Sequence, residues 1–284
     1  MPNPAPHIAL IMSSFVSASQ VGAKASGFCL SRLGVETAIL PTTLMGRHPG
    51  WGAPGGGATP ASYLKDMWDG IAAQDLPIAG MMTGYMATTD QVDLAVEIIA
   101  HVKAANPNAV ILVDPVMGDK KPNEDGRLYI PEAVAQAIKT RPLPLASYVT
   151  PNLWELEYLT GASLSTAAQA AAAVREHLPC PAVVTSVPQG GDIGAIYVSG
   201  ETAIATHHKK FAAVPHGGGD ALAGTLLAHF MNGDTPAAAL SQSVASIYAL
   251  MSGYGEDDKG ELPLIRLQSA LTDAAPLPLL NIEL

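Results

Sequence analysis

The residues with the clearest chemical potential lie in the stretch PHGGGDALAG, at positions 215–224. A helix N-terminus presents unpaired N–H groups and a partial positive charge, and both attract phosphate. Glycine lets the backbone approach such a group closely, so Gly217, Gly218 and Gly219 are candidates for an anion site. Asp220 would repel a phosphate, but it is suited to take a proton from a hydroxyl that attacks one. Taken alone, the stretch fits equally well a glycine-rich turn with Asp220 as an ordinary N-cap.

Two familiar nucleotide-binding motifs do not explain this stretch. A Walker loop requires Gly-Lys before Ser or Thr, and the chain contains no Gly-Lys pair. The dinucleotide fingerprint G-x-G-x-x-G follows a strand near the start of its domain, whereas GGGDALAG has another spacing and lies late in the chain. The glycines therefore indicate a different kind of phosphate site.

Carboxylates at two further strand ends strengthen the phosphate interpretation. VDPVMGD places Asp114 and Asp119 at the end of an apolar run, and TPNLWELE places Asn152 and Glu155 at a strand-to-helix junction. Carboxylates without a neighbouring base suit a hard cation such as Mg²⁺. Either stretch alone fits a solvated loop better. Three acidic strand-end sites in one chain favour a metal–phosphate site.

The composition bounds the class of protein. The chain has 284 residues, of which 48% are hydrophobic and 14% charged, so it can bury a large core. Its net charge of −10 opposes non-specific binding to nucleic acid or to acidic membranes. Two cysteines give neither a disulfide framework nor a zinc pattern. No signal peptide or membrane span is expected, and we expect a cytoplasmic protein.

Strand and helix patterns alternate along the chain. Apolar runs predict strands, and 3.6-residue spacing predicts helices. The predicted strands cover 7–12, 35–40, 77–86, 109–119 and 181–186, with a hairpin over 194–208; the predicted helices cover 22–34, 62–72, 87–107, 165–178, 217–233 and 235–253, and 146–161 is a short strand feeding a helix. With no linker, the pattern predicts one α/β domain over 1–284, a mostly parallel sheet with helices on both faces. Ligands of such sheets bind beyond the carboxyl ends of the strands.

The motifs DPVMGD, TPNLWELE and GGGD, in this order, resemble those of the ribokinase-like vitamin kinases, and the chain is most similar to the pyridoxal kinases among them. IMSS, SRLG, GRHPGWG and TGYM extend the resemblance over nearly the whole chain. The resemblance implies a ribokinase-like fold. It also implies transfer of phosphate from MgATP to the hydroxymethyl group of pyridoxal, pyridoxine or pyridoxamine, by a homodimer that often uses a monovalent cation such as K⁺.

The resemblance also implies roles for particular residues. Asp220 would be the catalytic base and Gly217–Gly219 the anion hole. The metal and its waters would be held near the phosphates by Asp114, Asp119 and Glu155. The ATP site would be lined by Asn152, Thr185 and Ser186. Apart from the resemblance, His216 directly precedes the glycines and is a candidate to touch the nucleotide. The substrate would meet Ser13, Tyr85 and a flap at 45–60 that carries His48, Pro49 and Gly50.

Some positions depart from the family pattern. Gly218 stands where threonine or valine is usual, Pro49 stands where a substrate-contacting threonine is usual, and Trp51 replaces a tyrosine. The phosphate end therefore matches better than the ring pocket. A hydroxymethylpyrimidine kinase is the first alternative, although the Gly-Ser-Asp-x-Ser-Gly-Gly start of that group is missing. A non-catalytic protein that binds pyridoxal phosphate or a nucleotide is the second.

Two other features have structural explanations. His207 and His208 are adjacent on a predicted strand, so they should point to opposite faces and share no metal. Trp154 is expected to pack on its own helix.

Overall fold

The computed structural model describes residues 7–120 and 125–283. The strands in this part are β1 (Ile8–Val16), β2 (Glu36–Met45), β3 (Gly56–Ala58), β4 (Ile78–Thr83), β5 (Val110–Val113), β6 (Gly118–Asp119), β7 (Arg127–Leu128), β8 (Tyr148–Val149), β9 (Ala182–Gln189), β10 (Asp192–Ser199), β11 (Thr202–Lys209) and β12 (Leu280–Asn281). The α-helices are α1 (Ala23–Arg32), α2 (Ala61–Ala72), α3 (Thr89–Ala105), α4 (Glu132–Thr140), α5 (Leu153–Thr160), α6 (Ala167–His177), α7 (Gly218–Met231), α8 (Pro236–Ser252) and α9 (Ala270–Asp273), and short 3₁₀ turns cover Pro49–Trp51, Leu143–Leu145 and Glu256–Asp258.

The main sheet confirms the predicted architecture. Its strand order over the described residues is β12-β11-β10-β9-β8-β5-β4-β1-β2-β3. The strands from β2 to β9 in this order are parallel, while β3 at one edge and β10, β11 and β12 at the other are antiparallel. β1 is buried along nearly its whole length, because helices cover both faces of a central parallel strand.

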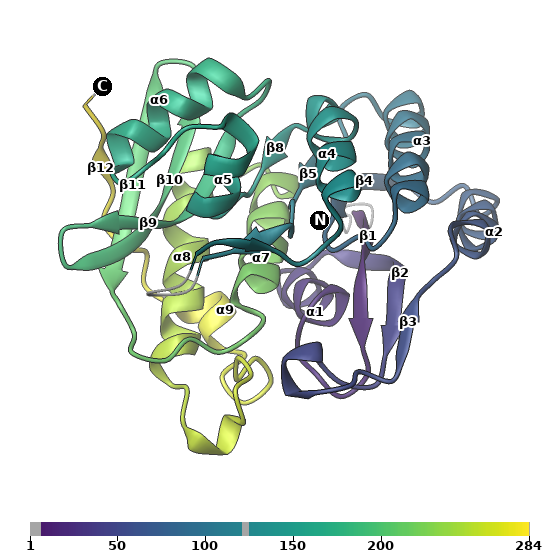
Figure 1. Ribbon diagram of the computed structural model, residues 1–284, viewed down its shortest axis with the longest axis horizontal. Helices are drawn as coiled ribbons and strands as arrows, with labels where there is room; N and C mark the ends of the chain where they lie inside the picture. Colours follow the sequence, from purple (N-terminus) through teal and green to yellow (C-terminus); the bar gives the residue numbers. More distant parts are fainter. Residues whose placement is uncertain (1–6, 121–124, 284) are drawn as a thin grey trace, which may run out of the picture.

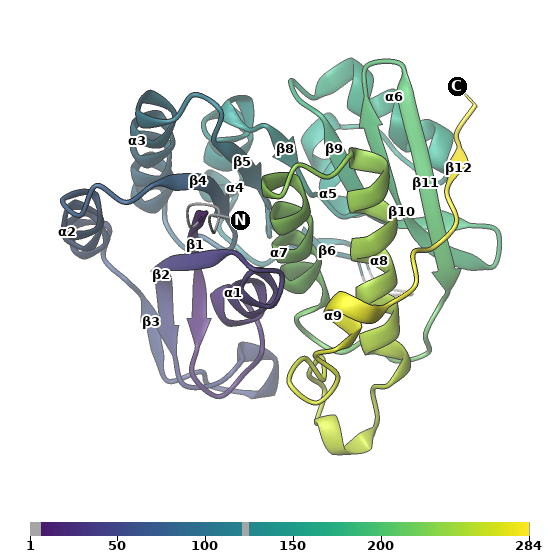
Figure 2. The same cartoon turned by 180° about the vertical axis from the view of Figure 1, so that it is seen from behind.

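Two hydrophobic layers hold the helices to the sheet. The helices α2 to α6 pack on one face, in front in Figure 1, and α1, α7, α8 and α9 pack on the other, in front in Figure 2. The first layer contains Trp68 and Leu156, and the second contains Leu226 and Leu250. At Gly224 of α7 an added Cβ would lie 2.6 Å from the Ser26 carbonyl oxygen of α1, so glycine permits these two helices to touch.

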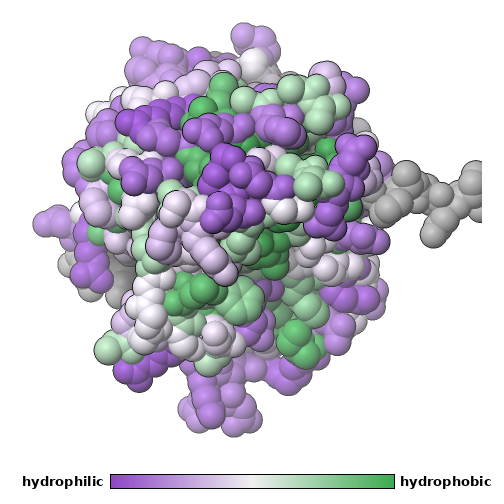
Figure 3. All heavy atoms as spheres, turned by 90° about the vertical axis from the view of Figure 1, so that its right-hand side faces the viewer, coloured by the Kyte–Doolittle hydropathy of each residue, from purple (hydrophilic) through white to green (hydrophobic). Residues whose placement is uncertain are grey.

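The surface around α2 and β3 is mixed in character. Figure 3 shows this side of the molecule, where hydrophilic residues surround smaller hydrophobic areas. Leu44 on β2 and Tyr63 on α2 are exposed large hydrophobic side chains. Within the described residues, none of the helices combines the length and the apolar character of a membrane span.

The sequence pattern placed most of the long elements correctly, but it missed the helix α4 and the short strands. The strand predicted over 109–119 is wrong in its second half, because β5 ends at Val113 and the chain turns before β6. The strands β3, β6, β7 and β12 have only two or three residues each, too few to show a period of two. β3 pairs with β2, β12 pairs with β11, and β6 and β7 pair with each other. A local sequence pattern does not show such pairing.

The parallel strands bring the predicted site residues to one edge of the sheet. The amide of Gly84 donates to Met12, that of Asp114 to Thr83, that of Thr150 to Val113 and that of Thr185 to Pro151, at 2.9–3.1 Å. These bonds place the segments that follow β4, β5 and β8 side by side, between the middle of β1 and the middle of β9. This is the edge at which ligands of such sheets bind.

One buried amide fixes the base of the predicted flap. The Thr88 side chain caps α3 by accepting from the backbone amide of Gln91, three residues on, which is the spacing of a capping box. The Gln91 side chain is fully buried, and its Nε2 donates to the Thr42 and Thr59 carbonyl oxygens at 2.8 Å each. Its Oε1 accepts from Ala87 N at 2.8 Å. Gln91 thus ties both stems of the 45–60 segment to the start of α3.

Replacing Gln91 by leucine should lower the free energy of unfolding by on the order of 2–4 kcal/mol, because three buried hydrogen bonds would be lost and only the Thr42 carbonyl would keep another donor, the Thr59 amide. Chemical denaturation would measure this loss. Gln74→Leu at an exposed site is the matched control and should change stability by less than about 0.5 kcal/mol. Equal effects in the two variants would contradict the role given to Gln91.

Candidate active site

The N-terminus of α7 gives each glycine of the run a different role. Gly217 caps the helix with φ 93°, and an added Cβ there would lie 2.3 Å from the Gln20 carbonyl oxygen. At Gly218 an added Cβ would meet only the flexible end of Met251, at 2.7 Å. At Gly219 it would meet nothing within 4 Å. Gly217 is therefore required by backbone conformation, whereas Gly219 faces open space where a ligand can approach the helix amides.

Asp220 lies in the first turn of α7 and is held by the start of α1. The Gly22 amide donates a hydrogen bond to its carboxylate. Burial raises the pKa of Asp220, and this hydrogen bond partly offsets the increase. Gly22 has φ 57°, and an added Cβ would lie 2.3 Å from the Ser14 carbonyl oxygen, so no other residue fits here without movement. A carboxylate with a raised pKa is suited to accept a proton near neutral pH.

Three carboxylates of the site interact. The Asp114 and Glu155 residues are only 7% and 4% exposed. Burial raises the pKa of Asp114 well above its usual value, and the negative charges of Glu155 and Asp220 raise it further. Burial likewise raises the pKa of Glu155 to about 7. So much unbalanced negative charge in a buried place favours a cation or a cationic ligand complex.

Glu155 and Asn152 form a capping box at the start of α5. Asn152 Oδ1 accepts from Glu155 N, and Glu155 Oε2 accepts from Asn152 N, both at 2.9 Å. Glu155 Oε1 accepts from the amides of Met117 and Gly118 at 2.6 and 3.3 Å, and Asn152 Nδ2 donates to the Gly118 carbonyl at 2.9 Å. The TPNLWELE motif thereby positions the turn that follows Asp114.

Asp119 differs from the other predicted metal ligands because it is exposed. It begins the β6–β7 hairpin, its Oδ1 accepts from Lys120 N, and its carboxylate accepts from the Tyr129 hydroxyl. Its charge still raises the pKa of Glu155. Over the described residues no three Asp, Glu, His or Cys side chains converge into a ready-made metal site. The set suits an ion such as Mg²⁺, which uses few carboxylates and completes its shell with water and substrate phosphate.

Thr185 and Ser186 occupy an irregular point of β9. Asn152 and Thr185 form a parallel bridge, which brings the predicted nucleotide residues of α5 and β9 together. Ser186 is exposed and has φ 59°, an uncommon conformation for serine, where the β9–β10 register shifts. Such backbone irregularities are frequent at ligand sites.

Ser13 and Tyr85 line the other side of the strand ends. Ser13 is buried, and its Oγ has no hydrogen-bond partner in the described part of the chain. An added Cβ at Gly84 would lie 2.3 Å from that Oγ. Tyr85 is half-buried, and its carbonyl oxygen accepts from Thr42 Oγ1 at 2.6 Å. An unpartnered buried hydroxyl beside a glycine fits a place where a ligand supplies the missing hydrogen bond.

The flap bends back to the glycine run. His48 accepts from Gly50 N at 3.1 Å, so Pro49 and Gly50 sit in a short capped turn. The His48 ring lies 4.4 Å from that of His216, and Trp51 lies 5.5 and 5.7 Å from these two rings. Burial and the neighbouring His216 lower the pKa of His48, against an opposing effect of Glu261. His216 is therefore placed against the flap as well as beside the glycines.

A cleft opens where the flap meets the loop before α9. Its volume is about 390 Å³, and it is lined by Ala18, Trp51, Asp258, Lys259 and Glu261. Glu261 Oε2 accepts from Gln20 N at 2.9 Å, which ties this loop to the segment before α1. Gln20, Gly22 and Glu261 were not among the predicted site residues. Only the Val-Gly pair before α1 carried a signal, since a glycine before a helix can mark a cap.

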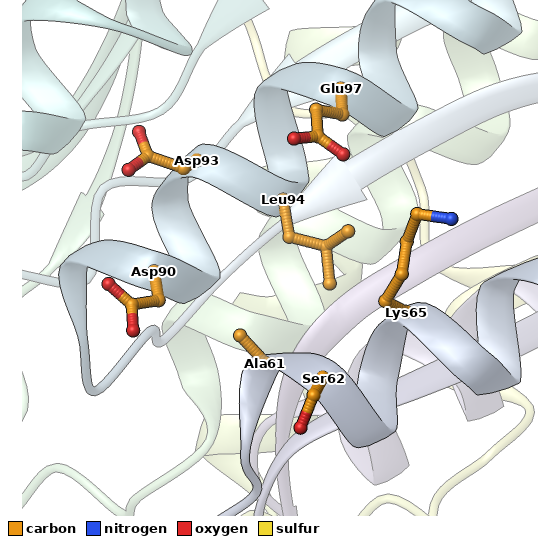
Figure 4. A pocket seen from close by; sticks show the side chains of 7 residues that line it. All are labelled: Ala61, Ser62, Lys65, Asp90, Asp93, Leu94 and Glu97. Carbon is orange, nitrogen blue, oxygen red and sulfur yellow. The ribbon is translucent and has the colours of Figure 1, made fainter.

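A second hollow, between α2 and α3, is not a candidate site. Figure 4 shows Asp90, Asp93 and Glu97 of α3 facing Ala61, Ser62 and Lys65 of α2 across it. Lys65 pairs with Asp69, and Asp93 pairs with Arg141. The acidic groups are solvated or paired, so this is an ordinary charged surface.

The other sequence interpretations can be compared with the structure. His207 Nε2 lies 3.8 Å from Asp192 Oδ2, whereas the centre of the His208 ring lies 4.9 Å from that of Tyr248 on α8. The two histidines therefore point to opposite faces of β11, as predicted. Cys29 and Cys180 are both free thiols.

Comparison with known proteins identifies the family. A model of the phosphomethylpyrimidine kinase family matches residues 51–263. Pyridoxal kinase PdxY of Corynebacterium diphtheriae is 30% identical over 273 residues, covering 92% of this chain and 94% of that protein. The chain belongs to the phosphomethylpyrimidine kinase family that this model describes. Pyridoxal kinase PdxY of Leifsonia xyli is 31% identical over 268 residues, covering 91% and 93%.

Solved structures agree on the fold. Pyridoxal kinase from Entamoeba histolytica superposes with a TM-score of 0.88 at 21% identity, covering 98% of this chain and all of that one. Pyridoxal kinase from Leishmania donovani in complex with ADP and pyridoxamine gives a TM-score of 0.88 at 22% identity, covering 97% and 99%. The family's ribokinase-like fold, predicted from the motifs, is confirmed over nearly the whole chain.

Replacing Gly219 by alanine should separate activity from stability. The methyl group meets no protein atom, so the free energy of unfolding should be unchanged or rise by up to about 1 kcal/mol from helix propensity. It would occupy the space of the transferred group, so kcat/KM should fall by about 10²-fold. Gly217→Ala is the contrasting control and should lose about 2 kcal/mol or more of stability, from its positive φ and its contact with Gln20. Full activity in Gly219→Ala would show that the amides face no ligand.

The buried carboxylates should make the ligand-free protein less stable as pH rises. Because the pKa of Asp114 is raised on folding, the folded state binds the proton more tightly than the unfolded state. Its contribution is therefore complete below the unfolded pKa of about 4 and is lost as pH rises toward the folded pKa. Thermal unfolding without metal should show Asp114→Asn losing less stability than wild type between pH 5 and 8. Asp66→Asn at an exposed site should follow wild type, and identical curves for all three proteins would refute the assignment.

Proposed function

We propose that the protein transfers the γ-phosphoryl group of ATP to the 5′-hydroxymethyl group of pyridoxal, and of pyridoxine or pyridoxamine, to give the 5′-phosphate. The observation that carries the proposal is the α7 N-terminus, where Asp220 with a raised pKa lies next to an open Gly219. The pyridoxal kinase relatives at 30–31% identity support the choice of acceptor.

The chemistry follows from the positions of these groups. Asp220 accepts the proton of the hydroxymethyl group, and the alcohol oxygen forms a bond to the γ-phosphorus of ATP. The bond from that phosphorus to the bridging oxygen breaks, and ADP leaves. The amides of Gly217–Gly219 stabilise the negative charge of the transferring group. This stabilisation is larger in a buried site than in water. The flap with His48, Pro49 and Gly50 contacts His216, the residue before Gly217, through the His48 ring. In this position the flap would exclude water from the acceptor.

Mg²⁺ is part of the proposal because the carboxylates fit it. Asp114, Asp119 and Glu155 would hold the ion and its waters, and when bound it would neutralise charge on the phosphates. Asn152, Thr185 and Ser186 would line the nucleotide beside them. The structure provides at this edge the oxygen groups that a hard cation prefers, and their uncompensated burial is the supporting observation.

Asp220→Asn tests the base directly. The amide cannot accept the proton, so formation of pyridoxal 5′-phosphate from pyridoxal and MgATP should fall by about 10²–10⁴-fold. Binding of MgATP, measured by calorimetry, should persist. In wild type kcat should fall toward acid with a midpoint above the usual aspartate pKa, because burial raises the pKa of Asp220. Unchanged turnover in Asp220→Asn would exclude it as the base.

A hydroxymethylpyrimidine kinase remains the alternative acceptor assignment, favoured by the description of the matching family model. The same assay run with hydroxymethylpyrimidine decides between them by the ratio of kcat/KM values. Binding of pyridoxal phosphate or nucleotide without turnover would instead support a non-catalytic binding protein.

A homodimer, a cytoplasmic location and activation by K⁺ also belong to the proposal. They are supported by the resemblance to the vitamin kinases. Sedimentation equilibrium would measure the oligomeric state. Assays with K⁺ replaced by a larger organic cation would measure the cation requirement.

A further inference from the structure

Trp154 fills a space that the β6–β7 hairpin leaves for it. An added Cβ at Gly118 on β6 would lie 2.3 Å from Cζ3 of the indole, and one at Gly126, just before β7, would lie 1.7 Å from Nε1. The benzene part of the ring therefore contacts one arm of the hairpin and the pyrrole part contacts the other. Neither arm can carry a side chain at this point.

The fit is specific at Gly126. The three atoms nearest to an added Cβ there all belong to Trp154, whereas at Gly118 the Arg127 carbonyl oxygen is equally close. Gly126 does not have a positive φ, so its φ gives no reason for glycine at this position. The indole gives a steric reason.

The hairpin positions a carboxylate of the site. Asp119 follows Gly118 directly, pairs with Arg127 in the β6–β7 ladder, and receives the Tyr129 hydroxyl. Gly118 is also hydrogen-bonded to Glu155 and Asn152 beside the ring. The indole and the α5 cap therefore set, from one side, how far Asp119 lies from Glu155.

Simple packing on α5 is the competing explanation. The Trp154 ring does lie 6.0 Å from that of Tyr158, but it is only partly buried. The space that side chains at Gly118 and Gly126 of the hairpin would need is occupied by this ring. We propose that Trp154 is a positioning residue that holds the β6–β7 hairpin, and with it Asp119, at the distance from Glu155 that binding of MgATP requires.

The proposal rests on the proposed kinase activity and predicts a selective defect. Trp154→Ala should raise KM for MgATP by about 10–10²-fold, while KM for pyridoxal changes less than about threefold. Gly126→Ala should show the same selective defect, because the new methyl group displaces the hairpin. In the double variant Gly126→Ala with Trp154→Leu the clash is removed, and KM for MgATP should return to within about threefold of that of Trp154→Leu alone.

Controls separate positioning from stability. Trp68→Leu removes a buried tryptophan of α2 that packs against His101, and it should lower the melting temperature without a selective change in KM for MgATP. Gly70→Ala adds a methyl group where no atom lies within 4 Å, so it should leave KM and Kd for MgATP unchanged and raise the melting temperature slightly through helix propensity. Calorimetric Kd values for MgATP provide the same comparison without turnover, so failure of the proposed acceptor would not hide the result.

Three results would overturn the proposal. These are normal MgATP binding by Gly126→Ala, equal rises in KM for both substrates in Trp154→Ala, and a double variant whose KM for MgATP stays well above that of Trp154→Leu alone. The last would mean that the hairpin is displaced by something other than the indole.

Discussion

Two helix N-termini meet at Asp220, and the rest of the site is arranged around that meeting. The amide of Gly22, the N-cap of α1, donates a hydrogen bond to the Asp220 carboxylate. Gly217, the N-cap of α7, lies so close to the Gln20 carbonyl oxygen that no side chain fits between them. Both caps have a positive φ that glycine alone adopts easily. The partial positive charges of the two helices therefore favour a buried anion and the phosphate that approaches it.

The buried carboxylates, by contrast, favour a cation. Asp114 and Glu155 are buried near Asp220, and each raises the free energy of the folded state when ionised without a cation. Three backbone amides reduce this cost by donating to Glu155: that of Asn152 in the capping box, and those of Met117 and Gly118. Stability is thus given up at the same place where a metal–nucleotide complex would bind, as expected for a functional site.

The flap and the paired strands β6 and β7 are attached to the rest of the structure by a small number of well-defined contacts. The buried Gln91 amide fixes both stems of the flap, while His48 and His216 join its tip to the glycine run. The hairpin with Asp119 is fixed by Glu155, Asn152 and the Trp154 ring.

The sequence by itself determined the long elements, the parallel sheet and the chemistry of its carboxyl edge. Hydrophobic periodicity, the Thr88 cap and the order of DPVMGD, TPNLWELE and GGGD are local signals, and the family follows from them. Only the tertiary structure decided which glycine is open to a ligand, which amide holds Asp220 and why Gly126 has no side chain. These depend on contacts between segments far apart in the chain, such as Gln20 with Gly217 and Trp154 with Gly126. No local pattern of residues encodes such contacts, because steric exclusion acts only once the chain has folded.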